Sequence, residues 1–248
     1  MGVKTKRDWR IELLRFIATI GIAIFHFEWI YLGNPVWFRH FYLWVEFFFV
    51  LSGFFLAKNA DGSSGDYQSL KYTYGIGRKL FPAYLIGFIF CFVVYLLYHS
   101  VFNIRGILSL LWKSKWEMLY LQLSGIDSNA PMINGVTAYI PALLVASLIL
   151  HYFYVNHRKL TVNLIITLVP IAIYSHIIET YENLSQWMVY ENWYTIGILR
   201  GVAGISVGML AYILVQRIDV RGGAAVFFYD AMHQYRFFYV YGCNDSFA

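Results

Sequence analysis

One apolar stretch contains an arginine and a histidine at a spacing that places them on the same face of a helix. Residues 11–32 are apolar over about the 20 residues that a helix needs to cross the hydrocarbon core of a bilayer, yet they include Arg15 and His26. Eleven residues at about 100° each make roughly three turns, and the two side chains are then roughly 16 Å apart along the axis. A guanidinium can bind a phosphate or carboxylate, and a neutral imidazole can accept a proton near neutral pH.

This stretch alone does not decide whether Arg15 and His26 have a functional or a structural role. Ionisable groups at membrane depth cost several kcal/mol unless they face protein or water, and they are therefore candidates for function. Alternatively, Arg15 extends to the inner headgroups and His26 reaches the outer interface. A second apolar stretch, residues 38–57, has Glu46 near its middle. We expect Glu46 to be the buried partner of His26 or Arg15, either as a structural ion pair or as a catalytic orienter.

The composition excludes a soluble domain. Hydrophobic residues make up 59% and charged residues 13% of the chain, with a mean hydropathy of +0.55, whereas soluble chains average about 25% charged residues. The net charge of +5 fits loops at an anionic membrane surface and requires no nucleic acid as a partner. Cys91 lies in an apolar stretch and Cys243 in the tail, so we expect neither a disulfide nor a metal site.

We therefore predict an all-α polytopic membrane protein, a single domain over residues 1–248 with a cytoplasmic N-terminus. The predicted spans are residues 11–32, 38–57, 82–98, 136–155, 160–178 and 196–215, with Pro82 opening the third. Residues 104–111 and 118–123 are too short to span and are expected to be interfacial or re-entrant. Residues 222–248 form an atypical tail. This orientation places twelve Lys and Arg inside and four outside (Arg39, Arg105, Lys113 and Lys115), as the positive-inside rule requires.

Three motifs together resemble the acyltransferase-3 family of integral membrane acyltransferases. They are RFIATIGIAIFH (residues 15–26), FFFVLSGFFLA (residues 47–57) and RKLFPAY (residues 78–84). A weaker similarity is LRGVAGISVGMLA (residues 199–211). The resemblance extends from residue 10 to about residue 215. Because family members typically have more spans than are predicted here, the resemblance suggests a C-terminally truncated member.

The resemblance implies transfer of an acyl group, often acetyl, from acyl-CoA to a carbohydrate hydroxyl. The acceptor would be a surface polysaccharide, its precursor or a glycolipid, at the multi-pass bacterial inner or plasma membrane. Acyl-CoA would be a donor substrate, and no cofactor would be bound permanently. In this reading His26 is the general base, Arg15 holds the donor and Glu46 is their partner. Arg78, Lys79 and Tyr84 would form the donor-binding entrance.

Several alternatives stay open from the sequence. Ser52 could act as a nucleophile, although Ser52 and Gly53 are more typical of close helix packing in membranes. Arg200 could pair with Glu46, line the same cavity or close the bundle. The intramembrane Arg, His and Glu could serve a transporter or flippase, or the chain could be an inactive truncated family member. The remaining histidines that we considered, His151, His157 and His176, are predicted to be interfacial.

Overall fold

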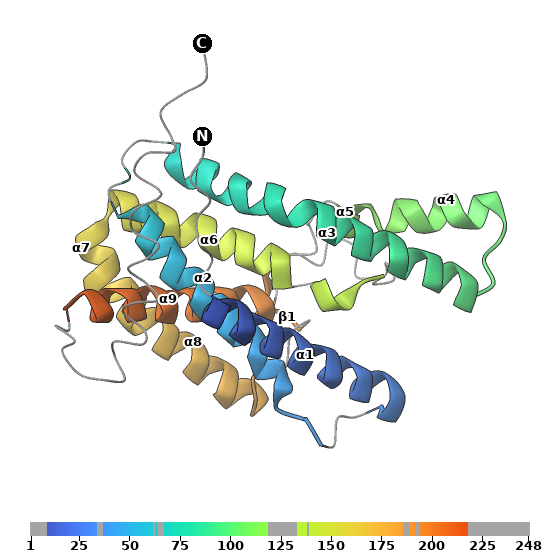
Figure 1. The fold of residues 1–248 in the computed structure, drawn as a ribbon, viewed down its shortest axis with the longest axis horizontal. Coiled ribbons are helices and arrows are strands. Elements are labelled where there is room, and N and C mark those ends of the chain that lie inside the picture. The colour runs from blue at the N-terminus through green and yellow to red at the C-terminus, as the bar shows by residue number, and fades with distance from the viewer. Residues whose placement is uncertain are drawn as a thin grey trace, which may run out of the picture.

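A computed structural model describes residues 9–33, 37–61, 63, 67–118, 133–137, 139–185, 189–191 and 194–217. Within these ranges the chain is mainly helical, and Figure 1 shows long helices forming one bundle. The helices are α1 (Trp9–Leu32), α2 (Trp44–Ala60), α3 (Gln68–Tyr98), α4 (Ile104–Lys113), α5 (Lys115–Met118), α6 (Tyr139–Asn156), α7 (Arg158–Leu160), α8 (Ile166–Tyr181) and α9 (Ile196–Arg217). A 3₁₀ turn (Phe41–Leu43) precedes α2, another (Gly135–Thr137) precedes α6, and a π-helical stretch (Thr161–Ile165) joins α7 to α8.

Six helical segments in the described ranges are long and apolar enough to cross a membrane. They are Trp9–Leu32, Phe41–Ala60, Gln68–Tyr98, Tyr139–Asn156, Arg158–Tyr181 and Ile196–Arg217. This confirms the predicted all-α polytopic membrane fold. For five of the six, the helix and the predicted span agree to within three residues at each end. The predicted tail, residues 222–248, lies outside the described residues.

The third span differs from the prediction at its start. The helix α3 begins at Gln68, 14 residues before Pro82, and Pro82 lies inside it. The early part of α3 is helical because its polar side chains find partners on α6: Ser69 Oγ lies 2.9 Å from His151 Nδ1, and the ring of Tyr72 stacks on the His151 ring. His151 is only 2% exposed. It is therefore a buried residue of the contact between α3 and α6, and its predicted depth near the membrane surface stays a prediction.

Helices α2 and α9 form the centre of the bundle because glycines let their backbones approach closely. A Cβ on Gly208 would collide with the Val50 carbonyl and come within 2.8 Å of Phe54 N, and a Cβ on Gly53 would collide with the backbone of Ile205. Small residues four positions apart, such as Gly204 and Gly208, commonly allow close packing of helices in membranes. The Gly53 contact confirms the packing interpretation of that glycine.

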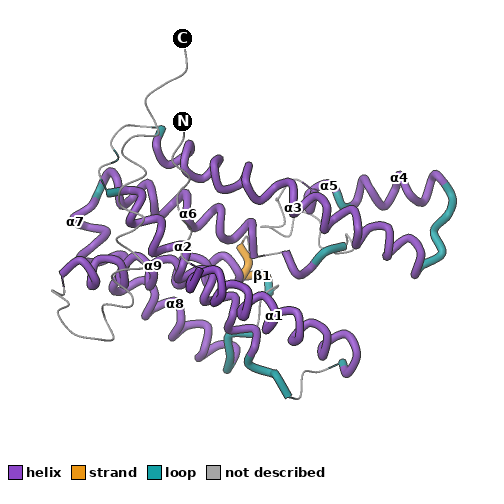
Figure 2. The backbone as a smooth tube through the Cα atoms, viewed as in Figure 1, coloured by secondary structure: helices purple, strands orange, loops and turns teal. Residues whose placement is uncertain are grey.

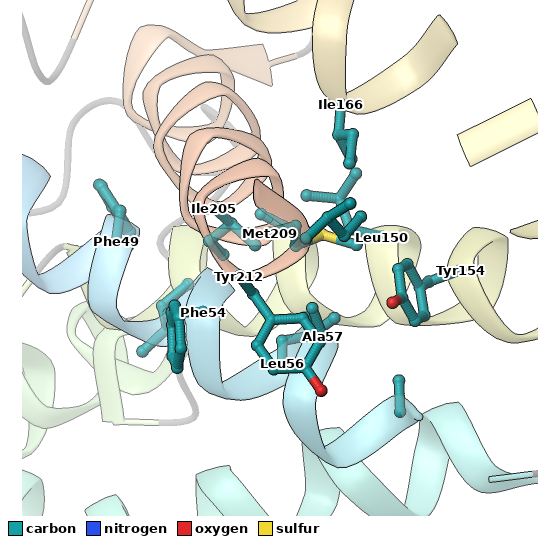
Figure 3. Packing of buried hydrophobic residues seen from close by; sticks show 14 of the residues in the cluster. Phe49, Phe54, Leu56, Ala57, Leu150, Tyr154, Ile166, Ile205, Met209 and Tyr212 are labelled. Atoms are coloured by element: carbon teal, nitrogen blue, oxygen red, sulfur yellow. The ribbon is translucent and has the colours of Figure 1, made fainter. Parts of the chain in front are cut away.

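Around this contact lies the main apolar core, shown in Figure 3. It draws side chains from α2, α6, α8 and α9, including Phe49, Phe54, Leu56, Ala57, Leu150, Tyr154, Ile166, Ile205, Met209 and Tyr212. In the most apolar windows of α9 and α6, 56% and 50% of the residues are buried, against 17% in α1 and in α3. Helices α6 and α9 are thus central, whereas α1 and α3 flank the core and present apolar side chains outward, as lipid contact requires.

Two shorter features complete the fold. The helix α4 runs back beside the end of α3, with Leu110 packed against Phe88 and Phe92. Two segments were predicted to be interfacial or re-entrant. Of these, residues 104–111 form a helix that folds back on α3, and residues 119–123 of the second segment lie outside the described ranges. Figure 2 shows the short strand pair among the helices, where β1 (Tyr190–Glu191) lies antiparallel to β2 (Tyr194–Thr195) just before α9.

Candidate active site

The first helix presents Arg15 toward α2. Because α1 is continuous from Trp9 to Leu32, the spacing between Arg15 and His26 is a helical one, as predicted. The Arg15 guanidinium lies 5.9 Å from the centre of the Phe55 ring on α2. Further along α1, the ring of Phe25 lies 6.0 Å from that of Tyr42, centroid to centroid. Contact with α2 and with the 3₁₀ turn that precedes it therefore extends along α1 from Arg15 to the residue beside His26.

The two candidate side chains are both accessible. The Arg15 side chain is 40% exposed, and its Nη1 is 2.9 Å from Glu12 Oε1, one turn earlier on the same helix. His26 is half-buried, with its ring against that of Phe25 at 5.5 Å between centroids. Within the described ranges no hydrogen bond to the His26 ring is present. An imidazole in this position can accept a proton from a bound ligand without first losing a protein partner.

The structure corrects the expected partner of Glu46. Its Oε1 accepts a hydrogen bond from Arg200 Nε at 2.7 Å, and its Oε2 accepts one from the Tyr174 hydroxyl at 2.7 Å. Glu46 therefore pairs with α9 and α8 rather than with His26 or Arg15, because α2 packs on α9 with this face inward. Gly204 makes the contact possible, since a Cβ there would lie 2.6 Å from Phe49 Cβ and 3.1 Å from Glu46 Oε2.

This pair also decides among the alternatives for Arg200. Arg200 is 1% exposed, and the Glu46 side chain is 14% exposed. The Glu46 carboxylate accepts hydrogen bonds from both Arg200 and Tyr174, and these contacts fix α2, α8 and α9 relative to each other. The sequence contained a signal for Arg200, a lone cation in an apolar run, but none for Tyr174, because a tyrosine in a membrane helix is unremarkable by itself.

The predicted donor-binding residues separate into two environments. Arg78 and Lys79 are exposed on α3, as an entrance requires. Tyr84 is 2% exposed, and its hydroxyl donates a hydrogen bond to the carbonyl of Glu117 on α5. The structure therefore gives Tyr84 a structural contact on a different face of α3. It does not bring Tyr84 together with Arg78 and Lys79.

Ser52 has a local partner. Its hydroxyl donates to the carbonyl of Phe48, one turn earlier, at 2.7 Å. A serine that satisfies its own helix in this way needs no further partner in an apolar environment, and no described base lies within hydrogen-bond distance of it. The geometry gives no support to Ser52 as a nucleophile.

Sequence reasoning missed a buried carboxylate beyond His26. Glu28 is 7% exposed, and its two oxygens accept hydrogen bonds from Trp37 N at 3.3 Å and Phe38 N at 3.0 Å. It thereby holds the connection between α1 and α2. At about 100° per residue, Glu28 leaves the helix on nearly the opposite side from His26, so it does not orient that ring. The sequence signal that could have identified Glu28 is an acidic residue near the end of an apolar stretch.

The helices and their buried charges define an integral membrane protein with several transmembrane segments. Comparison with protein families then identifies its class: the family model for the acyltransferase domain of the acyltransferase-3 type matches residues 8–229. The match covers most of the chain, and the protein belongs to the acyltransferase-3 family. Comparisons with curated proteins and with solved structures find no match.

Proposed function

We propose that this protein is a membrane O-acyltransferase that moves an acyl group, acetyl in the simplest case, from acyl-CoA to a carbohydrate hydroxyl. The acceptor is a surface polysaccharide or its precursor, and the location is the bacterial plasma membrane. The observation that carries the proposal is the accessible His26, three turns from Arg15 on one helix, in a chain of this family.

A sugar hydroxyl is a weak nucleophile, so the reaction needs a base near neutral pH. In the proposed step His26 takes the proton of the acceptor hydroxyl as its oxygen forms a bond to the thioester carbonyl carbon. The carbon–sulfur bond then breaks, and the departing thiolate of coenzyme A takes the proton from His26. Arg15, roughly 16 Å from His26 along the axis of α1, binds an anionic group of the donor through charge-assisted hydrogen bonds.

Arg78 and Lys79 serve the same donor at a distance from the base. Helix α1 packs against α2, whereas α3 packs against α6, so the two groups lie on different flanks of the core (Figure 1). Coenzyme A carries its phosphates and its thioester at opposite ends of a long flexible arm. One donor can therefore bind cations on α3 with its phosphates while its acyl group extends toward α1.

In this proposal Glu46 has no direct part in proton transfer. Both of its oxygens are engaged by Arg200 and Tyr174. It acts instead by holding α2, and hence the surface against which α1 packs.

The test is acyl transfer by the full chain in lipid nanodiscs, measured with radiolabelled acetyl-CoA and glycans from the source cells. We expect His26→Ala and His26→Gln to lower the rate by about 10²–10⁴, the usual range for loss of a general base. His176→Gln is the matched control, since His176 is an exposed histidine on α8, and its rate should not change. A His26→Gln variant that is folded and active would refute the assignment of His26.

Donor recognition has its own test. Replacing Arg78 and Lys79 together with Gln should raise the KM for the donor and leave the KM for the acceptor unchanged. The matched control replaces Lys113 and Lys115, two cations at the far end of α4 and the start of α5. If both double variants alter only the amount of inserted protein, the donor role of Arg78 and Lys79 is wrong.

A further inference from the structure

A second polar site lies at the end of the bundle where α2 and α9 end and α7 begins (Figure 1, left). Its centre is Asp61, directly after α2. Asp61 Oδ1 accepts a hydrogen bond from the Tyr154 hydroxyl at 3.0 Å, and Oδ2 accepts one from the Tyr212 hydroxyl at 2.8 Å. Arg158 Nη1 is 2.6 Å from Oδ1. Figure 3 shows Tyr154 and Tyr212 reaching toward the end of α2 from two other helices.

Beside this cluster the structure has a pocket of about 280 Å³. Its lining includes Asp61, Arg158 and Tyr212, together with the last two residues of α9, Gln216 and Arg217. The pocket lies at the end of the bundle that is predicted to be cytoplasmic. Nothing in the proposed acyl transfer uses these residues, and α1 contributes none of the lining.

The charges of the pocket favour an anion. The lining contains two guanidinium groups, of Arg158 and Arg217, and one carboxylate, which leaves one positive charge in excess. The carboxylate is already engaged by two hydroxyl donors and one guanidinium, so its own negative charge is offset. Arg158 has further N–H donors beyond the one bound to Asp61. Arg217 is exposed, and no ion pair of Arg217 is present in the part of the chain that the structure describes.

Two protein partners hold the exposed Arg158 side chain in the absence of a ligand. Its guanidinium is bound to Asp61 and lies 5.0 Å from the centre of the Tyr154 ring. Asp61 is in turn held by two tyrosines from α6 and α9. A guanidinium held in this way loses less conformational freedom on binding than a free surface arginine, and its planar fork matches the oxygens of a phosphate.

We propose that this pocket binds a phosphate ester through Arg158 and Arg217, with the Gln216 amide as an additional donor. Its volume is slightly below that of drug-sized ligand sites, which begin at about 300 Å³. It therefore suits a phosphate with a short attached group rather than a whole nucleotide cofactor. Such a group is found on the headgroups of inner-leaflet phospholipids and on soluble phosphate esters. The proposal does not depend on acyl transfer.

The experiment measures binding of inorganic pyrophosphate to the full chain in phosphatidylcholine nanodiscs by isothermal titration calorimetry. We expect Arg217→Gln to weaken binding by about 10-fold to 100-fold, as expected for loss of a hydrogen bond to a charged group. Tyr212→Phe, which frees Asp61 from one donor while keeping the ring, should weaken binding less. Arg105→Gln, an exposed arginine on α4, is the matched control and should bind as the wild type does.

A second arm separates the two sources of phosphate. Nanodiscs with about three parts phosphatidylcholine to one part phosphatidylglycerol supply an anionic headgroup at the surface. If the site takes a lipid headgroup, the anionic lipid should weaken pyrophosphate binding to the wild type but not to Arg217→Gln. If it takes a soluble ester, the lipid should have the same small effect on both. Equal pyrophosphate affinity in wild type and Arg217→Gln, or no binding in phosphatidylcholine, would overturn the proposal.

Discussion

Replacing Glu46 with Gln should destabilise the bundle severely, because it removes the negative partner of a buried arginine. Arg200 is 1% exposed and binds Glu46 Oε1 at 2.7 Å. Unit charges about 4 Å apart attract by about 4 kcal/mol at an effective dielectric constant of about 20. Gln keeps an oxygen for Tyr174 but carries no charge. Breaking such a pair on one side typically costs about 3–5 kcal/mol, since the remaining charge stays buried without compensation.

The appropriate assay is a double-mutant cycle on the free energy of unfolding, measured by denaturant titration in mild detergent. Glu46→Gln should lose about 3–5 kcal/mol, and Glu46→Gln combined with Arg200→Met should recover much of that loss, because no buried charge remains. A conservative control is Glu12→Gln, which breaks the half-exposed pair with Arg15 and should cost less than about 1 kcal/mol. The reasoning fails if Glu46→Gln costs no more than Glu12→Gln, or if the two core substitutions are additive.

Two further predictions test the packing and the α5 contact. Gly208→Ala should lower the free energy of unfolding by about 1–3 kcal/mol, since its Cβ would collide with the Val50 carbonyl. Gly75→Ala, which has open space around it, should be neutral or slightly stabilising. Equal stability of the two variants in the same titration would contradict the close contact between α2 and α9. Burial raises the pKa of the Glu117 carboxyl, opposed by hydrogen bonds from the Ile133 and Asn134 backbone N–H groups. The folded state therefore holds the proton more tightly than the unfolded state, so stability should rise as the pH falls from neutral toward 4.5, the ordinary pKa of a glutamate side chain. Glu117→Gln should remove that pH dependence in thermal unfolding.

The fold was predictable from the sequence wherever one local signal was enough. Apolar runs of sufficient length identified the spans, because the hydrophobic thickness of a bilayer sets their length. The start of α3 was not predictable in this way. Pro82 indicates a helix start, yet the helix begins before it and runs through it, because Ser69 and Tyr72 meet His151 on α6. Tertiary contacts overrode the local propensity.

The candidate site was predictable only in part, for a related reason. The spacing of Arg15 and His26 follows from helix geometry alone, and α1 preserves it. The partners of Glu46 are 154 and 128 residues away in the chain, and no local pattern specifies which helices meet. The pocket combines Asp61, which follows α2, with residues of α7 and α9, so it too required the packed structure.

Stability and chemistry fall on different helices in this protein. The helices α2 and α9 hold the glycine contacts and the buried ion pair, and a change there acts on the whole bundle. The candidate groups for acyl transfer lie on α1 and α3, where only 17% of the window residues are buried. Substituting an accessible side chain on a sparsely packed helix removes few contacts, so its effect on folding should be small. Loss of transfer in a fully folded His26 variant would therefore report on the reaction itself, whereas loss of transfer in a Glu46 variant must first be corrected for the fraction of folded protein.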